Sequence, residues 1–371
     1  MGQLTQSANR PPIHPRRERI LIIRLSAIGD VIMASGMIRA LRRRYPQAYL
    51  AWLTQPGPDA LLRANAELDE VLVWPKEAWR AHLKAGRWRE LAGAYRLLIK
   101  TLRERRFDTV VDAQGLLKSG VWAWLSGAPF RLGLGSREAS HVLMTRVIER
   151  GNNNPRFGSE YIDAAVALGA APEDFMPRVA TCEANHRNAA RVLRTALGQT
   201  VDEPTFVALA PFTTRPQKHW FDRYWRTLIG ELAHEFDWPI VILGGRKDIR
   251  AGEAMAARAS PGVSASVKSL AGQTSLGETM AVVEQASLLI GVDTGITHMG
   301  TAAGRPTVAL FGSTRPYTAP GKKSTTILFE PMHCAPCQKH PVCGGRFTCM
   351  ERLTPARVLN AARWQLARAM I

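Results

Sequence analysis

The sequence contains no apolar run that approaches the roughly 18 to 20 residues needed to cross a membrane. Residues 1–18 are polar, proline-rich and basic, and they lack the apolar core of a signal peptide. From these two absences we expect a disordered basic tail at residues 1–18 and a cytoplasmic protein.

Acidic residues are scarce relative to basic ones, with 31 Asp and Glu against 49 Lys and Arg and a formal net charge of +18. This excess predicts an acidic partner, which is a nucleic acid, an anionic membrane surface or a phosphorylated substrate. An enzyme with a merely basic surface is the plainer alternative. The 371 residues suggest two domains of ordinary size, and 46% hydrophobic residues suffice for a core in each.

Cysteine is also rare, and four of the five cysteines fall within one short segment: Cys334, Cys337, Cys343 and Cys349. Four cysteines this close could hold a structural zinc ion, although the spacing matches no standard finger and His333 and His340 add competing ligands. Reduced free cysteines and disulfides are the alternatives, and a cytoplasmic chain disfavours disulfides. We expect the isolated Cys182 to be a buried apolar residue.

The first strand is not followed by G-x-G-x-x-G, so the dinucleotide fingerprint is absent there. Short apolar runs instead alternate with helical patterns, which indicates parallel sheets. The composition shifts at 171–204, and we predict an N-terminal domain at 19–200, a C-terminal domain at 201–352 and a terminal helix at 353–371.

The most informative strand end is the stretch from Leu288 to Gly300. A buried strand breaks at Asp293, Thr294 and Gly295 and then enters a helix. The free N–H groups of such a helix N-terminus favour an anion, so we predict a diphosphate cradle to which Thr297 and His298 add polar atoms. The alternative is an ordinary Asp or Thr N-cap.

A second strand end of this kind is Arg24 to Asp30 (RLSAIGD), where Gly29 allows a close backbone approach. Asp30 is either an N-cap or a carboxylate at the carboxyl edge of the sheet, where α/β proteins bind ligands. Such a carboxylate can act as a general base.

Further polar residues follow other strands. In the N-terminal half, Asp112, Gln114, Lys118 and Ser119 could face the same site as Asp30, and we interpret Arg131–Arg137 as a glycine-rich basic loop for phosphate or sugar. In the C-terminal half, Lys218 beside Thr213 and Thr214 suits an oxyanion or a leaving diphosphate, or else it is a surface lysine. Asp248 could accept hydrogen bonds from ribose hydroxyls.

The segment from Trp79 to Arg106 carries nine Lys or Arg and two Glu, a net charge of +7. Its apolar residues fall near helical spacing. A helix that covers the sheet with a solvated basic face is the plainer interpretation, and a face that meets phosphates or an anionic membrane is the alternative.

Four motifs together carry a family resemblance: RLSAIGDV at 24–31, DAQGLLKS at 112–119, TTRPQKHW at 213–220 and VDTGITH at 292–298. Over about residues 19–330 the chain resembles the ADP-heptose:lipopolysaccharide heptosyltransferases of glycosyltransferase family 9, and it is most similar to type I. The resemblance implies a GT-B fold, in which two Rossmann-like α/β domains face each other across a cleft. It also implies a terminal helix that packs back on the N-terminal domain.

By this resemblance Asp30 is the catalytic base and Lys218 offsets charge on the departing ADP. The donor-binding positions are Thr213, Thr214, Asp248, Thr274, Ser275, Leu276, Asp293, Thr294, Gly295, Ile296 and His298. The acceptor-binding positions are Ser26, Gly29, Gln114, Lys118 and Arg131.

The implied reaction is an inverting transfer from ADP-heptose that needs no cofactor and no catalytic metal. The implied acceptor is phosphorylated Kdo-lipid A at the inner face of the membrane, where the protein would be peripheral. Two alternatives remain: a family 9 transferase with another acceptor or nucleotide sugar, and a basic nucleic-acid-binding protein, although we expect no nucleic acid partner.

Overall fold

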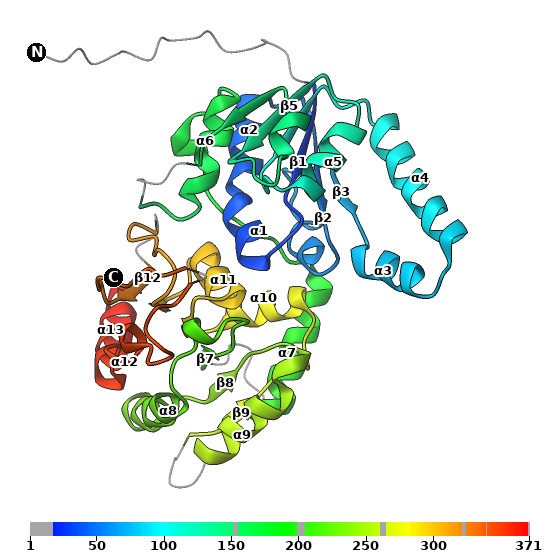
Figure 1. The fold of residues 1–371 in the computed structure, drawn as a ribbon. Coiled ribbons are helices and arrows are strands. Elements are labelled where there is room, and N and C mark those ends of the chain that lie inside the picture. The colour runs from blue at the N-terminus through cyan, green and yellow to red at the C-terminus, as the bar shows by residue number, and fades with distance from the viewer. Residues whose placement is uncertain are drawn as a thin grey trace, which may run out of the picture.

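The computed structural model describes residues 18–150, 155–198, 205–259, 265–320, 324–338 and 340–369. They form two α/β halves, each built on a six-stranded parallel sheet (Figure 1). The expected tail at residues 1–18 lies, apart from Glu18, outside the described residues.

The first sheet has the order β3-β2-β1-β4-β5-β6. Its strands are β1 (Arg19–Ile23), β2 (Tyr49–Thr54), β3 (Glu70–Val73), β4 (Thr109–Asp112), β5 (Phe130–Leu134) and β6 (Arg146–Ile148). Its α-helices are α1 (Ile28–Ala34), α2 (Gly36–Arg44), α3 (Lys76–Lys84), α4 (Trp88–Glu104), α5 (Leu117–Leu125) and α6 (Ser159–Ala167). Short 3₁₀ turns are η1 (Pro58–Leu61), η2 (Ser140–Leu143) and η3 (Pro172–Asp174).

The second sheet has the order β12-β11-β10-β7-β8-β9. Its strands are β7 (Val207–Ala210), β8 (Ile240–Ile242), β9 (Val267–Ser269), β10 (Leu288–Val292), β11 (Thr307–Phe311) and β12 (Thr325–Phe329). The helices of this half are α7 (Glu183–Leu197), α8 (Asp222–Phe236), α9 (Ile249–Ala259), α10 (Leu276–Gln285), α11 (Gly295–Ala303), α12 (Thr348–Glu351) and α13 (Pro355–Ala369), with 3₁₀ turns η4 (Pro216–Lys218) and η5 (Arg246–Asp248).

The central strands are mostly apolar because helices cover both faces of each sheet. All five residues of β10 are buried, as are four of the five in β1. In register, Ile23 at the end of β1 lies between Leu53 of β2 and Asp112 of β4. The polar residues that follow these strands therefore gather at one edge of the sheet.

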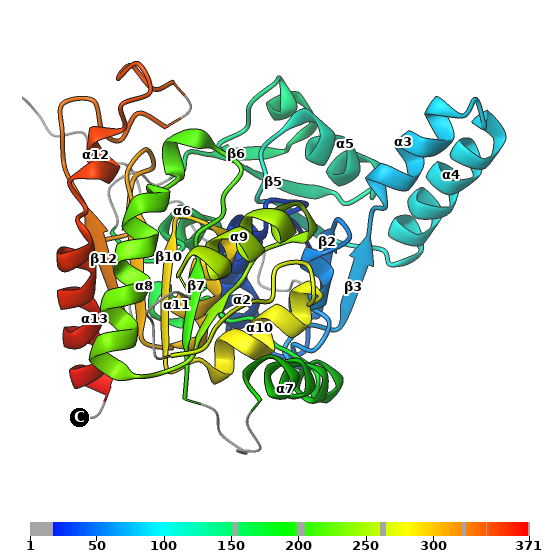
Figure 2. The ribbon, with the colours of Figure 1, turned by 90° about the horizontal axis from the view of Figure 1, so that it is seen from below.

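Two predicted elements differ in detail. The basic segment 79–106, for which one helix was the plainer interpretation, forms two helices, α3 and α4. Residues 131–134 of the predicted phosphate loop belong to strand β5. Figure 2 shows α3 and α4 projecting from the rest of the first half, and no described helix is both long and apolar enough to cross a membrane.

Helix α7 belongs by its contacts to the second half, although the predicted boundary at 200 placed it in the first. Ala189 and Leu193 lie in a core cluster with strands of the second sheet. Asn188 also donates to Glu278 of α10 at 2.8 Å. The structure therefore places the change of domain before Glu183.

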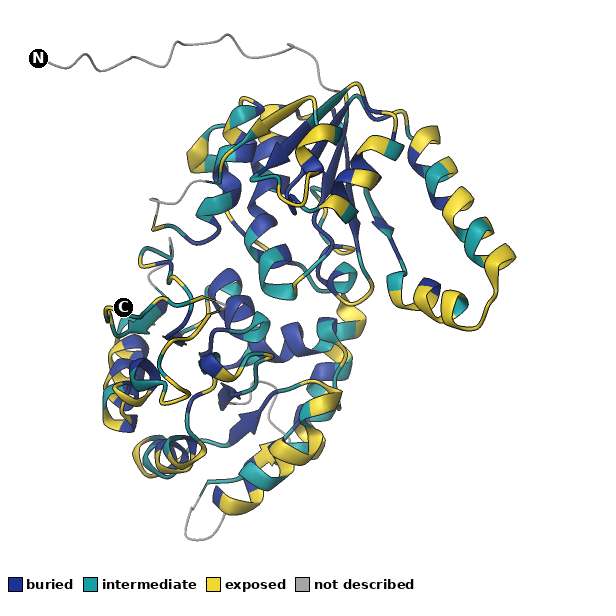
Figure 3. Cartoon of the chain, in the orientation of Figure 1, coloured by how far each residue is buried: buried dark blue, intermediate teal, exposed yellow. Residues whose placement is uncertain are grey.

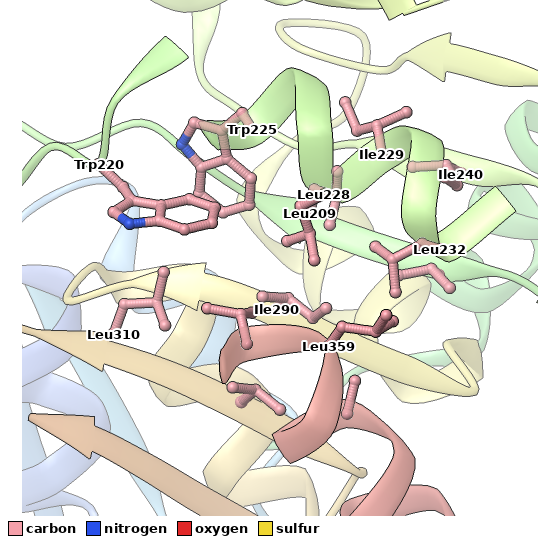
Figure 4. Packing of buried hydrophobic residues seen from close by; sticks show 14 of the residues in the cluster. Leu209, Trp220, Trp225, Leu228, Ile229, Leu232, Ile240, Ile290, Leu310 and Leu359 are labelled. Carbon is pink, nitrogen blue, oxygen red and sulfur yellow. The ribbon is translucent and has the colours of Figure 1, made fainter. Parts of the chain in front are cut away.

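The terminal helix α13 packs on the second sheet, so the expectation that it crosses to the N-terminal domain is wrong. Its apolar stripe includes Val358 and Leu359, which are buried in one core with Ile290 of β10 and Leu232 of α8 (Figure 4). Arg363 also pairs with a glutamate of α8. The stripe covers a sheet face that would otherwise be exposed to water.

Candidate active site

The two halves meet where α1, which follows β1, packs against α11, which follows β10. A Cβ on Gly29 would lie 2.5 Å from Cδ2 of His298, and one on Gly295 would lie 2.8 Å from Cγ2 of Ile28. Both distances are too short for a side chain, so glycine is required at each position for the helices to approach this closely. The contact brings the Asp30 turn beside the Asp293 turn.

Asp30 lies in the first turn of α1, and its side chain is 32% exposed. Its Oδ2 lies 2.5 Å from Nη2 of Arg24 and accepts from the Ala27 amide at 3.2 Å, while the Tyr161 hydroxyl donates to Oδ1 at 3.4 Å. Burial alone would raise the pKa of Asp30, but the Arg24 guanidinium and the Ala27 amide outweigh it and lower the pKa below 3.8. Asp30 is therefore ionised at neutral pH.

The loop that presents Asp30 is fixed by two buried side chains. Arg24 also donates from Nη1 to the Ala113 carbonyl at 3.1 Å. The side-chain oxygen of Gln114 accepts from the Leu25 amide at 2.8 Å and the Ser26 amide at 3.3 Å. The predicted acceptor residue Gln114 thus anchors the β1–α1 loop that contains Ser26.

Asp112, the last residue of β4, is fully buried. Its oxygens accept from the Gln114 and Gly115 amides at 3.1 and 3.0 Å and from the Ser119 hydroxyl at 3.0 Å. Burial raises the pKa of Asp112 despite these hydrogen bonds. Asp112 and Ser119 therefore fold the β4–α5 turn and do not reach a substrate.

On the second half, the buried Asp293 organises a cluster of polar side chains. Its Oδ2 lies 2.5 Å from Nζ of Lys218 and accepts from the Thr314 hydroxyl, and its Oδ1 lies 3.1 Å from Nε2 of His298. Burial opposes ionisation, but His298 and Lys218 together lower the pKa of Asp293 far below its ordinary value.

The ring of His298 has a defined orientation in this cluster. An ionised carboxylate only accepts hydrogen bonds, so Nε2 of His298 must carry the hydrogen that it shares with Asp293. Its Nδ1 lies 3.1 Å from the Tyr317 hydroxyl, and the rings of Phe157 and Phe311 flank the imidazole. Phe157 comes from the first half, so both halves enclose the ring.

The N-terminus of α11 is available for an anion. Thr294 occupies the N-cap position in extended conformation, but its side chain makes no capping hydrogen bond within the described chain. Asp293 bonds to the side chains above, and Thr297 donates back to the Val292 carbonyl at 2.6 Å. The N-cap alternative is therefore not realised, and the first-turn amides from Gly295 onward are free of a side-chain cap.

The remaining predicted donor residues follow neighbouring strands at the same edge of the second sheet: Thr213 and Thr214 after β7, Asp248 after β8, and Thr274 to Leu276 after β9. Several already have local roles. Asp248 accepts from the Gly245 amide at 2.8 Å, and Ser275 and Glu278 cap α10 reciprocally. Ile296 lies in the first turn of α11.

Two further predicted acceptor residues, Arg131 and Lys118, make no hydrogen bond or ion pair with Asp30 within the described residues, although the charge of Lys118 interacts with that of Arg24. Arg131 pairs in register with Val110, ahead of the strand end at Asp112, and donates to the Leu143 and Ala128 carbonyls. Lys118 is half-buried in the first turn of α5, where burial and nearby Lys76 lower its pKa.

Residues 95–344 match glycosyltransferase family 9 (heptosyltransferase). The chain belongs to this family. Lipopolysaccharide heptosyltransferase 1 of Pseudomonas aeruginosa is 28% identical to it over 328 residues, which is 86% of each chain.

Solved structures agree on the fold. A family 9 glycosyltransferase from Veillonella parvula aligns with a TM-score of 0.81 at 19% identity, covering 96% of this chain and 100% of its own. The E. coli heptosyltransferase WaaC with ADP-2-deoxy-2-fluoro heptose aligns with a TM-score of 0.67 at 21% identity, covering 92% and 98%. The predicted α/β fold of family 9, with two parallel-sheet domains, is confirmed.

Sequence reasoning missed four residues of this family 9 site: Arg24, Tyr161, Thr314 and Tyr317. Arg24 begins the RLSAIGDV motif, so its position was a usable signal. The two tyrosines and Thr314 reach the site only through tertiary packing, and nothing in the local pattern marks them.

Proposed function

We propose that this family 9 protein is an inverting heptosyltransferase that moves L-glycero-D-manno-heptose from ADP-heptose to the Kdo of the lipopolysaccharide inner core. One observation carries the proposal: α1 and α11 bring an ionised carboxylate, Asp30, beside an anion-binding helix end with its own lysine and histidine. Relatives named lipopolysaccharide heptosyltransferase and a neighbour holding an ADP-heptose analogue support the choice of donor and pathway.

In the proposed reaction Asp30 takes the proton of the acceptor hydroxyl. The acceptor oxygen forms a bond to C1 of the heptose while the bond from C1 to the diphosphate oxygen breaks on the opposite face, so the anomeric centre inverts. ADP leaves with the electron pair of the broken bond. Arg24 keeps Asp30 ionised between turnovers, which favours a carboxylate ready to accept a proton.

The departing ADP gains negative charge, and three groups can offset it. These are the Lys218 ammonium, the N-terminal amides of α11 and the positive end of its helix dipole. Asp293 repels phosphate, so we assign it the orientation of Lys218 and His298, both of which it already holds. This arrangement needs no catalytic metal ion.

We also propose that α3, α4 and α5 hold the protein on an anionic membrane, where a lipid-linked acceptor resides. The arm of α3 and α4 is basic, and Figure 3 shows its outer surface exposed. Trp88 and Leu97 of α4 are 64% and 66% exposed, and Leu117, Val121 and Trp124 form an exposed apolar stripe on α5. Basic charge beside exposed apolar side chains suits the boundary between headgroups and acyl chains.

Transfer from ADP-heptose to deacylated Kdo-lipid A tests the reaction, with wild type, Asp30→Asn and Asp30→Ala compared. We expect wild-type transfer with an inverted product, a loss of about 10²–10⁴-fold in both variants, and unchanged thermal stabilisation by ADP. Stabilisation by ADP without any transfer would refute Kdo-lipid A as the acceptor. If the protein shows no transfer and is not stabilised by ADP, the heptosyltransferase proposal is refuted. Tight, salt-sensitive binding to single-stranded nucleic acid would then favour nucleic acid as the partner.

Sedimentation with phospholipid vesicles tests the membrane surface. Wild type should bind vesicles containing anionic lipid and release them as salt rises. The double variant Trp88→Ser, Leu97→Ser should lose binding but keep transfer to a deacylated acceptor. Trp364→Ser, at an exposed position on α13, is the matched control. Equal binding by both variants would contradict the assignment.

A further inference from the structure

The four clustered cysteines surround one cavity in the second half. Cys334, Cys337, Cys343 and Cys349 all line a space of about 160 Å³ between the end of β12 and α12. None of them is in a disulfide in the described structure. The described part of residues 330–347 contains no helix or named strand, and long irregular segments in compact domains usually have a function or an added constraint.

The chain turns tightly after Cys343. The Arg346 amide donates to the Cys343 carbonyl at 3.2 Å, which closes a turn through Gly344 and Gly345, both with positive φ. This turn lies at the wall of the cavity that Cys334, Cys337 and Cys349 also line.

No three Cys, His, Asp or Glu side chains within the described residues yet have metal-binding geometry. The sulfurs therefore have to move inward to share one ion, and the cavity that they line is the space into which they can close. Four sulfur ligands in a tetrahedron are typical of a structural zinc ion, and iron is the alternative metal for such a ligand set.

We propose that Cys334, Cys337, Cys343 and Cys349 bind one zinc ion as four thiolates. Each thiol releases its proton to solvent when its sulfur binds, so binding becomes weaker as pH falls. Four thiolates around Zn²⁺ carry a net charge of −2, and Arg346, which also lines the cavity, offsets part of it.

The same loop supports the candidate active site. The Gln338 carbonyl accepts from the Gln217 side chain at 3.1 Å, and the Gln338 amide donates to the Ser313 carbonyl at 2.5 Å. Lys218 follows Gln217 and Thr314 follows Ser313, and these two residues contact Oδ2 of Asp293. The zinc ion would thus fix a loop that positions the ADP-binding groups without touching the substrate.

Thiol counting on the wild-type chain tests the site without any variant. Cys182 is exposed, contrary to the expected burial, so it should be the one thiol that reacts rapidly in the native, reductant-free protein. We expect one zinc per chain by elemental analysis and five reactive thiols after unfolding with a chelator. Two disulfides would leave one reactive thiol even then, and free cysteines would show no zinc. Either result, or iron in place of zinc, would overturn the proposal.

Variants then test the positioning role. Cys343→Ser should lose the zinc and most of the thermal shift that ADP gives, whereas Cys182→Ser should keep both. Removing zinc from the wild type with a chelator should reproduce the loss and zinc addition should reverse it, which covers the case in which the variant fails to fold. An unchanged ADP shift after zinc loss would refute the positioning role. Zinc content is measured independently of transfer, so failure of the zinc proposal can be distinguished from failure of the proposed function.

Discussion

The pair of Lys218 and Asp293 allows stability and catalysis to be separated. Their side chains are 16% and 8% exposed, and Nζ lies 2.5 Å from Oδ2. Removing one partner of a buried pair leaves an uncompensated charge and typically costs 3–5 kcal/mol. We expect Lys218→Met to cost about 3 kcal/mol, at the low end, because His298 and Thr314 still hydrogen-bond the carboxylate.

The double variant Lys218→Met, Asp293→Asn removes both charges. It should regain most of the lost stability, because replacing a whole buried pair with neutral groups is often neutral. It should not regain transfer, because the cation that offsets the departing ADP is still missing. Transfer in both variants should therefore stay at least about 10²-fold below wild type.

Urea unfolding, ADP binding and transfer should be measured on the wild type, Lys218→Met, Asp293→Asn and the double variant, with Lys268→Met as control. Lys268 is exposed on β9, so its loss should cost under about 0.5 kcal/mol. A double variant as unstable as the single one would refute the treatment of the two charges as a compensating pair. Recovery of transfer in the double variant would refute the role of Lys218 in departure of ADP.

Three further predictions follow from the structure. The pKa of Asp30 is lowered in the folded chain. The pair with Arg24 therefore stabilises the fold at pH values above the ordinary pKa near 3.8, and this stabilisation is lost as the pH falls through the lowered pKa. Arg24→Gln should raise the pKa of Asp30 and move the acid limb of kcat/KM to higher pH, and an unmoved limb would contradict Asp30 as the base. Gly29→Ala should cost about 1–3 kcal/mol and weaken transfer, because its Cβ would overlap the imidazole across the domain contact, and melting temperature with kinetics checks this. Leu359→Ala should cost about 2–5 kcal/mol and lower the unfolding midpoint of the second half, whereas exposed Trp364→Ala should cost under about 1 kcal/mol in the same denaturation assay.

The strand ends were predictable from the sequence because a parallel strand buried on both faces is an apolar run that stops abruptly at polar residues. This pattern located Asp30 and Asp293, and the fold then brought their turns together. The sequence did not distinguish an N-cap from a ligand site at either turn, since the same residue types serve both. Hydrogen bonds decided this at Asp293, whose partners lie on other elements.

Arg131 and α13 show where local patterns fail. Glycine and arginine together resembled a phosphate loop, but β5 pairs with its neighbours and the arginine is used by carbonyls of its own domain. The amphipathic stripe of α13 predicts that one face is buried without saying against which sheet. The resemblance placed it on the N-terminal half, whereas Leu359 lies in the second core.

The contact between α1 and α11 also constrains how the reaction can be organised. The proposed base belongs to one half and the anion-binding helix end to the other, so neither half holds a complete site. Two glycines lie at this contact. Gly29 of the first half leaves room for the side chain of His298, and Gly295 of the second half leaves room for that of Ile28. His298 is in turn bound to Asp293, which holds Lys218. A continuous set of contacts therefore runs from Gly29 of the first half through the imidazole and Asp293 to Lys218, the cation that we propose offsets the charge of the departing ADP.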